Sequence, residues 1–241
     1  MKCVFNRTCG IVLTAMLALA GCFSESTQAE AVNQTQTTKP SSPAPAPAPV
    51  QAQAPAMDFR EGVHYTTIVP AIPTQVPQGK VEVVEMFWYG CPHCYSLEPT
   101  IQRYLQTKPE NVVFQQVPAT LSPRWAYHAK LFYVGKMLDP TGEKHVHTKI
   151  FEALQKQRRQ INSDDAMIRF FGEQGFAPEQ VTKALQSMEM QAMLARSDEV
   201  GKGSKADSVP VIIVNGKYMT SPSKVGSEET LLQVINYLTK R

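Results

Sequence analysis

The feature that most constrains this chain is a pair of cysteines set directly after a strand-like segment. The pair forms the motif Cys91-Pro92-His93-Cys94, and it follows ten residues rich in valine and aromatic side chains, Lys80 to Tyr89. Such a run is typical of a buried strand. The fold must therefore end a strand of its sheet at the first of the two cysteines.

The segment after the motif is predicted to be a helix. Its apolar residues recur at every fourth position, at Leu97, Ile101 and Leu105, which is the spacing of one helix face. Pro92 suits the first helical turn, where its missing N–H matters least. The free backbone N–H groups of that turn and the helix dipole would stabilise a thiolate on Cys91.

The two cysteines are therefore expected to differ in role. His93 would add a donor or a positive charge beside Cys91, whereas Cys94, one turn inside the helix, should be less exposed and act as the resolving thiol. Each unit by which the pKa of Cys91 falls below the ambient pH stabilises the reduced form by about 1.4 kcal/mol. The same unit raises the two-electron potential by about 30 mV. These residues predict a disulfide donor.

The first 21 residues have the layout of an export signal. Lys2 and Arg7 precede an apolar run, Ile11 to Ala20, which is too short for a membrane span. The run ends in Leu19-Ala20-Gly21-Cys22, which resembles the lipobox of bacterial lipoproteins, where the cysteine is lipidated and becomes the mature N-terminus. The alternative is an ordinary signal in which Cys22 is incidental.

Residues 22–57 are expected to form a disordered tether. They are mostly Ser, Thr, Gln, Ala and Pro, a composition that cannot bury enough apolar surface to offset the entropy of ordering. Residues 58–241 remain, enough for one domain with a sizeable core. We therefore expect a periplasmic domain anchored through a lipid on Cys22, in either the inner or the outer membrane.

Composition excludes several other classes of protein. A net charge of only +3 argues against a nucleic-acid binder, which usually has a strongly basic face. No segment has the roughly 18 apolar residues of a membrane span. Cys3 and Cys9 leave with the signal and Cys22 carries the lipid, so the domain has one dithiol and no disulfide framework.

The residues around the dithiol resemble a known active site. Trp88-Tyr89-Gly90-Cys91-Pro92-His93-Cys94-Tyr95 resembles that of the DsbA family, bacterial thiol:disulfide oxidases of the thioredoxin superfamily. The resemblance extends over about 58–241, because Glu85 and Glu98 match acidic positions of the family. Val209-Pro210 matches its Val–cis-Pro loop, whose backbone pairs with the substrate peptide, and this implies substrate binding by Val209 and Pro210.

The resemblance also implies an α/β, thioredoxin-like fold with an inserted all-helical domain. Helical patterns run from Ser122-Pro123, a predicted N-cap and first turn, to about residue 202. A helical block between strands of one sheet indicates an insertion, here at about 123–202. Val209 to Val214 then reads as a short strand, and Asn215-Gly216 as the turn of a hairpin.

The partners implied by the resemblance are proteins. Unfolded exported chains with free thiols would be the substrates, and a quinone-linked inner-membrane protein of the DsbB type would restore the disulfide. We expect a monomer without a cofactor.

Glu85 is where the chain departs from the family. DsbA proteins often pair this strand glutamate with a lysine on the next strand, where this chain has Gln115 and Gln116. The charge of Glu85 is then less well compensated, and burial would raise its pKa. A proton relay from Glu85 to Cys94 is a hypothesis, and a carboxylate in water at the strand end is the alternative.

The aromatic residues beside the dithiol have two interpretations. Trp88, Tyr89 and Tyr95 are expected to form an apolar substrate surface, and core packing explains Trp88 equally well.

The other histidines and the methionines are interpreted as structural. His145 and His147 are two residues apart and are expected to be solvated, while His128 should be a satisfied core residue. Met188, Met190 and Met193 fit packing better than copper handling. We expect no metal site, because zinc would need four ligands of suitable geometry.

Two other functions remain open at this point. One is a reductase or isomerase on the same fold, although residues 22–57 are too polar and proline-rich for a dimerisation domain. The other is a redox-inert module that binds peptides or a metal. The redox potential of the dithiol would distinguish among the three.

Overall fold

The computed structural model describes residues 58–241. The predicted signal at 1–21, the lipidated Cys22 and the tether at 22–57 lie outside the described residues. Among the helices between residues 58 and 241, none is both long enough and apolar enough to cross a membrane.

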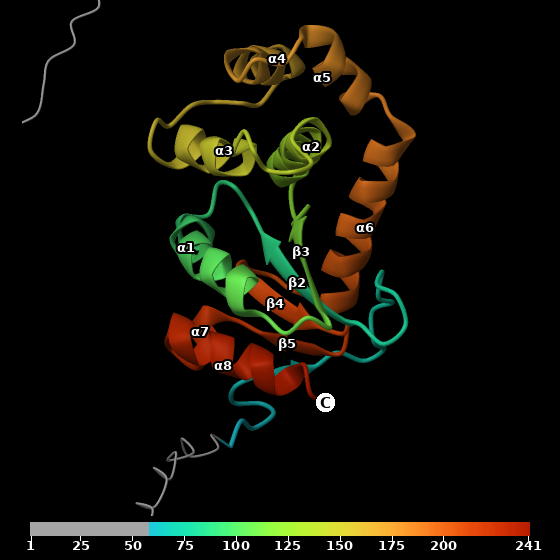
Figure 1. The fold of residues 1–241 in the computed structure, drawn as a ribbon, viewed down its shortest axis with the longest axis vertical. Coiled ribbons are helices and arrows are strands. Elements are labelled where there is room, and N and C mark those ends of the chain that lie inside the picture. Colours follow the sequence, from blue (N-terminus) through green and yellow to red (C-terminus); the bar gives the residue numbers. More distant parts are fainter. Residues whose placement is uncertain (1–57) are drawn as a thin grey trace, which may run out of the picture. The chain divides into compact units, whose positions relative to one another are not determined.

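The sheet has five strands in the order β1-β5-β4-β2-β3 (Figure 1). Their bounds are Thr66–Thr67 for β1, Val81–Phe87 for β2, Val112–Pro118 for β3, Val211–Val214 for β4 and Tyr218–Thr220 for β5. β2 pairs in parallel with β3 and antiparallel with β4. Six of its seven residues are buried, because both faces of this central strand are covered. Strand β2 leads directly to the cysteine motif.

Helices α1 and α8 cover one face of the sheet (Figure 1). α1 spans Pro92–Thr107, α8 spans Glu228–Leu238, and the short α7, Pro222–Val225, precedes α8. Leu97 and Ile101 of α1 pack with Val83 of β2 and Leu231 of α8 in one apolar cluster. The predicted apolar face of α1 is therefore confirmed, except that Leu105 remains exposed.

Helix α6, Met188–Ser204, reaches the other face of the sheet. Its Val200 packs with Val84 and Met86 of β2 in a second cluster. A buried ion pair adds to this contact, because Arg196 Nη2 lies 3.0 Å from Glu82 Oε2 and Nη1 donates to the Pro73 carbonyl at 2.8 Å. The C-terminal part of α6 thus joins the helical segment to the sheet.

Four further helices lie between β3 and α6 in the chain. They are α2 at Pro123–Leu138, α3 at Val146–Gln155, α4 at Asp164–Glu173 and α5 at Pro178–Leu185. Their buried side chains form a third cluster, which also contains Phe87, Tyr89 and both cysteines of the motif. Serines 122, 163 and 187 cap α2, α4 and α6 as hydrogen-bond acceptors. The predicted α/β fold with a helical insertion is confirmed.

Several structural expectations outside the site need correction. Met190 is buried and Met193 packs against the third cluster as expected, but Met188 is 84% exposed because it begins α6 on the solvent side. His128 is buried as predicted, yet its Nδ1 has no partner among the described residues. Burial lowers the pKa of His128 to about 4, so the ring is neutral.

Candidate active site

Cys91 occupies the N-cap position of α1, with Pro92 in the first turn. The backbone of Cys91 is extended, with φ −90° and ψ 117°, so β2 passes into the helix at this residue as the sequence predicts. A hydrogen bond from the Cys94 side chain lowers the pKa of Cys91 to about 6, and the backbone N–H groups of Cys94 and His93 act in the same direction. The positive charge of His93 contributes less, and burial opposes all of these effects. The thiolate is therefore the stable form of Cys91 at neutral pH.

Cys94 lies in the opposite environment. Its side chain is fully buried, and burial raises the pKa of its thiol far above the ordinary range. The hydrogen bond that Cys94 donates to Cys91 also holds its proton. The Cys91 sulfur is thus suited to act as a leaving group and nucleophile, whereas the Cys94 sulfur stays protonated and donates a hydrogen bond.

The loop before β4 meets Cys91 from the other side. The Val209–Pro210 peptide bond is cis, as the resemblance implies, and the Cys91 Sγ lies 3.4 Å from the Val209 carbonyl oxygen. Val209 is half-buried and Pro210 is buried. The structure therefore brings Val209 and the dithiol together across a gap of 118 residues in sequence.

Glu85 is fully buried on β2, so the alternative of a carboxylate in water is wrong. Burial, assisted by the charge of Glu98, raises the pKa of Glu85 to about 8. The Gln116 side-chain amide donates to Glu85 Oε2 at 2.9 Å and to Glu98 Oε1 at 2.8 Å. Gln116 therefore bridges the two carboxyl groups, and Glu85, when it is ionised, favours the protonated form of Cys94.

Tyr89 does not form a substrate surface, contrary to the sequence-based expectation. It is 1% exposed, because its ring packs between Phe87 and Phe151. Its hydroxyl lies 2.7 Å from His147 Nδ1, and its carbonyl accepts a 2.6 Å hydrogen bond from Gln155. Two residues of α3 thus contact Tyr89, one at its hydroxyl and one at its backbone carbonyl.

Trp88 and Tyr95 remain half-buried beside the dithiol. The Trp88 ring stacks on Trp125 of α2, with ring centroids 4.4 Å apart and an angle of 10° between the planes. The same ring fills the space above Gly90, where a Cβ would overlap it. A side chain at position 90 would therefore displace Trp88 from the stack.

The sequence-based prediction that His147 is solvated is also wrong. Its side chain is only 23% exposed, and its Nε2 lies 3.1 Å from Glu98 Oε1. His145, two residues earlier, is exposed as expected. His147 lies three residues before Ile150 and four before Phe151, both buried on α3. This i, i+3, i+4 relation is the sequence signal that indicates an inward-facing histidine.

Comparisons with known proteins agree with this geometry. A family model described as a DSBA-like thioredoxin domain matches residues 126–233. The thiol:disulfide interchange protein DsbA of Pseudomonas syringae pv. tomato is 37% identical over 76% of this chain and 84% of its own length. The DsbA of Azotobacter vinelandii is 33% identical over 96% of each chain. The crystal structure of Pseudomonas aeruginosa DsbA has 31% identity and a TM-score of 0.69, over 76% of this chain and 93% of its own.

The chain belongs to the DsbA family. Within this family assignment, the sequence located both cysteines, the cis-proline loop and the buried Glu85. The sequence analysis did not identify Gln155, which donates to the Tyr89 carbonyl, and it predicted no contact for His147, which lies against Glu98 of α1.

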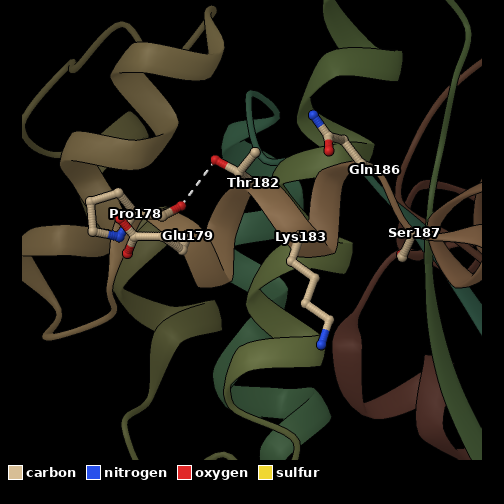
Figure 2. Close-up of a pocket in the computed structure, with 6 residues that line it drawn as sticks. All are labelled: Pro178, Glu179, Thr182, Lys183, Gln186 and Ser187. Atoms are coloured by element: carbon tan, nitrogen blue, oxygen red, sulfur yellow. Dashed lines mark hydrogen bonds between the residues drawn. The ribbon is translucent and has the colours of Figure 1, made fainter.

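The remaining groups and hollows of residues 58–241 do not form a second active site. In residues 58–241, no three His, Cys, Asp or Glu side chains are grouped so as to hold a metal ion. Figure 2 shows a hollow on α5, lined by Pro178, Glu179, Thr182, Lys183, Gln186 and Ser187. The Thr182 hydroxyl there donates to the Pro178 carbonyl at 3.0 Å within the same helix (Figure 2), so its polar group is already used.

Proposed function

We propose that this DsbA-family protein is a thiol:disulfide oxidase that donates a Cys91–Cys94 disulfide to exported proteins in the periplasm. The observation that carries the proposal is the position of Cys91 at the start of α1, where a hydrogen bond from the Cys94 side chain, assisted by backbone N–H groups, lowers its pKa to about 6. A thiolate stabilised in this way favours the reduced form of the dithiol, and its disulfide is correspondingly oxidising. This favours an oxidase over a reductase on the same fold.

The reaction consists of two exchanges. A substrate thiolate attacks Cys91 Sγ, the Cys91–Cys94 bond breaks, and its electron pair passes to Cys94, which takes up a proton. A second substrate thiolate then attacks the substrate sulfur bound to Cys91, and Cys91 leaves as a stable thiolate. The substrate loses two electrons and becomes a disulfide, and the enzyme gains them as a dithiol.

We assign the surrounding residues by their contacts. Pro92 and His93 form the first turn of α1, and the backbone N–H and charge of His93 lower the pKa of Cys91. The Val209–Pro210 loop would pair with the extended substrate beside the sulfur. Glu85, protonated at neutral pH because its pKa is about 8, would give its proton to Cys94 in the first exchange. A carboxyl group whose pKa lies near the working pH is suited to such a transfer.

Reoxidation and anchoring complete the proposal. The reduced dithiol would pass its two electrons to a DsbB-type, quinone-linked protein of the inner membrane. Cys22 would carry lipid that holds the monomeric 58–241 domain at a membrane surface through the 22–57 tether. Labelled fatty acid should enter the unsubstituted chain and not a Cys22→Ser variant, and equal labelling of both would contradict the anchor.

Redox equilibration tests the enzymatic proposal. The purified protein is mixed with reduced and oxidised glutathione, and the dithiol fraction is measured by alkylation and mass spectrometry. We expect a potential well above that of a reducing thioredoxin-type dithiol, and transfer of the disulfide to a reduced, unfolded protein. A strongly reducing potential would indicate a reductase, and no interconversion of dithiol and disulfide would leave only a redox-inert binding module.

A further inference from the structure

His147 of α3 is held in a fixed orientation by its neighbours. Its ring meets Phe87, Phe132 and Phe151 edge to face, with centroid distances of 5.4, 5.6 and 5.1 Å. An imidazole enclosed by aromatic rings has few rotamers available, because any rotation would break several contacts. The directions of its two nitrogens are therefore set by packing.

Both nitrogens have partners, and the partners determine which nitrogen carries hydrogen. Burial raises the pKa of Tyr89 well above its ordinary value, so the phenol keeps its proton and donates it to His147 Nδ1 at 2.7 Å. A neutral imidazole has one nitrogen that donates and one that accepts. His147 Nε2 therefore carries the hydrogen and donates it to Glu98 Oε1 at 3.1 Å.

The two carboxyl groups beneath the dithiol consequently differ in their donors. Glu98 Oε1 accepts from both His147 and Gln116. Glu85 accepts only from Gln116, and its Oε1 has no partner among the described residues. Donors to a carboxylate stabilise its ionised form, so the negative charge of the pair is more stable on Glu98 than on Glu85.

We propose that His147 is a positioning residue of the redox site: its Nε2 donates to Glu98, and this hydrogen bond leaves the proton of the Glu85–Glu98 pair on Glu85. The inference rests on the proposed function, because a proton kept on Glu85 has a use only if Cys94 takes it up when the disulfide opens. It assigns to the helical insertion a part in the chemistry of the sheet domain.

Three other titratable groups of the described residues interact with this pair: Cys94 with Glu85, and Tyr89 and His147 with Glu98. β3 contributes the neutral Gln116. Opposite Glu85, β4 places the apolar Ile212. A cavity of about 550 Å³ beside His147 is also lined by Lys136, Asp139 and His145. Asp139 is already bonded to the backbone N–H groups of Lys144 and Val146. Two side chains that line this cavity, His147 and Gln116, contact Glu98.

The test is a site-resolved titration of the two carboxyl groups. The full chain, with ¹³C-labelled glutamate carboxyls, is titrated by NMR in its reduced form, and the two signals are assigned with Glu85→Gln and Glu98→Gln variants. In His147→Phe, which retains an aromatic ring but no donor, we expect the Glu85 midpoint to fall by about one unit. The Glu85 signal at neutral pH should shift towards the ionised form, because the proton then spends more time on Glu98.

His147→Gln is the matched control, because its amide nitrogen can take the place of Nε2 and should restore the original midpoints. His145→Asn removes the neighbouring exposed histidine and should change neither signal. If His147→Phe does not fold, His147→Asn, whose amide stops short of Glu98, replaces it in the comparison with His147→Gln.

Unchanged midpoints in a folded donor-free variant would overturn the proposal, as would an equal shift in His147→Gln. The titration needs no redox assay, so failure of the His147 role and failure of the oxidase function give different results.

Discussion

The two ends of the first turn of α1 provide opposite environments for the same functional group. At the outer end, a hydrogen bond from Cys94 and free backbone N–H groups lower the pKa of Cys91 to about 6. At the inner end, burial and the hydrogen bond to Cys91 keep Cys94 protonated. The comparison shows that position in the fold, and not residue type, divides the two roles.

The largest effect should come from exchanging serine for each cysteine in turn. Cys91→Ser should reduce disulfide transfer to the uncatalysed rate, because the nucleophile is lost. Cys94→Ser, mixed with a substrate that already contains a disulfide, should attack it once through the Cys91 thiolate, release one substrate sulfur as a thiolate and accumulate a mixed disulfide through Cys91. Mass spectrometry distinguishes the two products, and a mixed disulfide formed through Cys94 would reverse the assignment of roles.

The buried environment of Glu85, beside Cys94, can be tested through the pH dependence of the free energy of unfolding. Glu85 has a pKa of about 8 in the folded protein against an ordinary 4.5. The contribution of Glu85 to the free energy of unfolding is therefore fully present below pH 4.5 and is lost as the pH rises through about 8. Glu85→Gln should remove this loss. Its free energy of unfolding, relative to that of the unsubstituted chain, should therefore be higher above pH 8 than at pH 4.5 by on the order of a few kcal/mol.

Denaturant unfolding of the reduced proteins at several pH values measures this difference, and Cys91 contributes equally to both proteins. Glu110→Gln, which removes an exposed carboxylate, is the control. A difference between the Glu85 variant and the unsubstituted chain that does not vary with pH would show that the carboxyl is ionised in the fold.

The outer environment can be tested through the pH dependence of the potential. Above pH 6 the reduced enzyme keeps Cys91 ionised, so one proton accompanies two electrons and the potential should fall by about 30 mV per pH unit. Below pH 6 two protons are taken up, and the slope should be about 59 mV per unit. Glutathione equilibria across this range measure both slopes, and a single slope up to pH 8 would place the Cys91 pKa near its ordinary value.

The smallest effect is expected for His93. Its charge is the last of the causes that lower the pKa of Cys91, behind the Cys94 hydrogen bond and the backbone N–H groups. His93→Ala should raise the midpoint of thiolate absorbance at 240 nm by less than about one unit, while His145→Asn leaves it unchanged. A larger rise would make the histidine, and not the helix terminus, the main source of Cys91 acidity.

The sequence predicted those parts of the site that depend on local structure. The strand before Cys91, the helix after it and the cap at Cys91 all follow from composition and spacing within about 25 residues. The Val209–Pro210 loop was located by resemblance, because nothing local indicates which distant proline meets the dithiol. The burial of Glu85 followed from its place in an apolar strand.

The misplaced residues depend on how the insertion packs against the sheet domain. Tyr89 and His147 come from segments 58 residues apart and contact each other only because α3 lies against the loop before Cys91. The Arg196–Glu82 pair likewise joins residues 114 positions apart. Such contacts are fixed by tertiary packing, which the periodicity of a single segment does not describe.

The stack of Trp88 on Trp125 has a consequence for measurement. The chain contains only these two tryptophans. Their rings lie nearly parallel, with centroids 4.4 Å apart, and Trp88 is three residues from Cys91 along the chain. Indole emission therefore arises entirely from the neighbourhood of the reacting sulfur, and exciton coupling between the rings should give a paired band in circular dichroism. The protein carries its own optical reporter, which will register any event that separates the insertion from the redox loop.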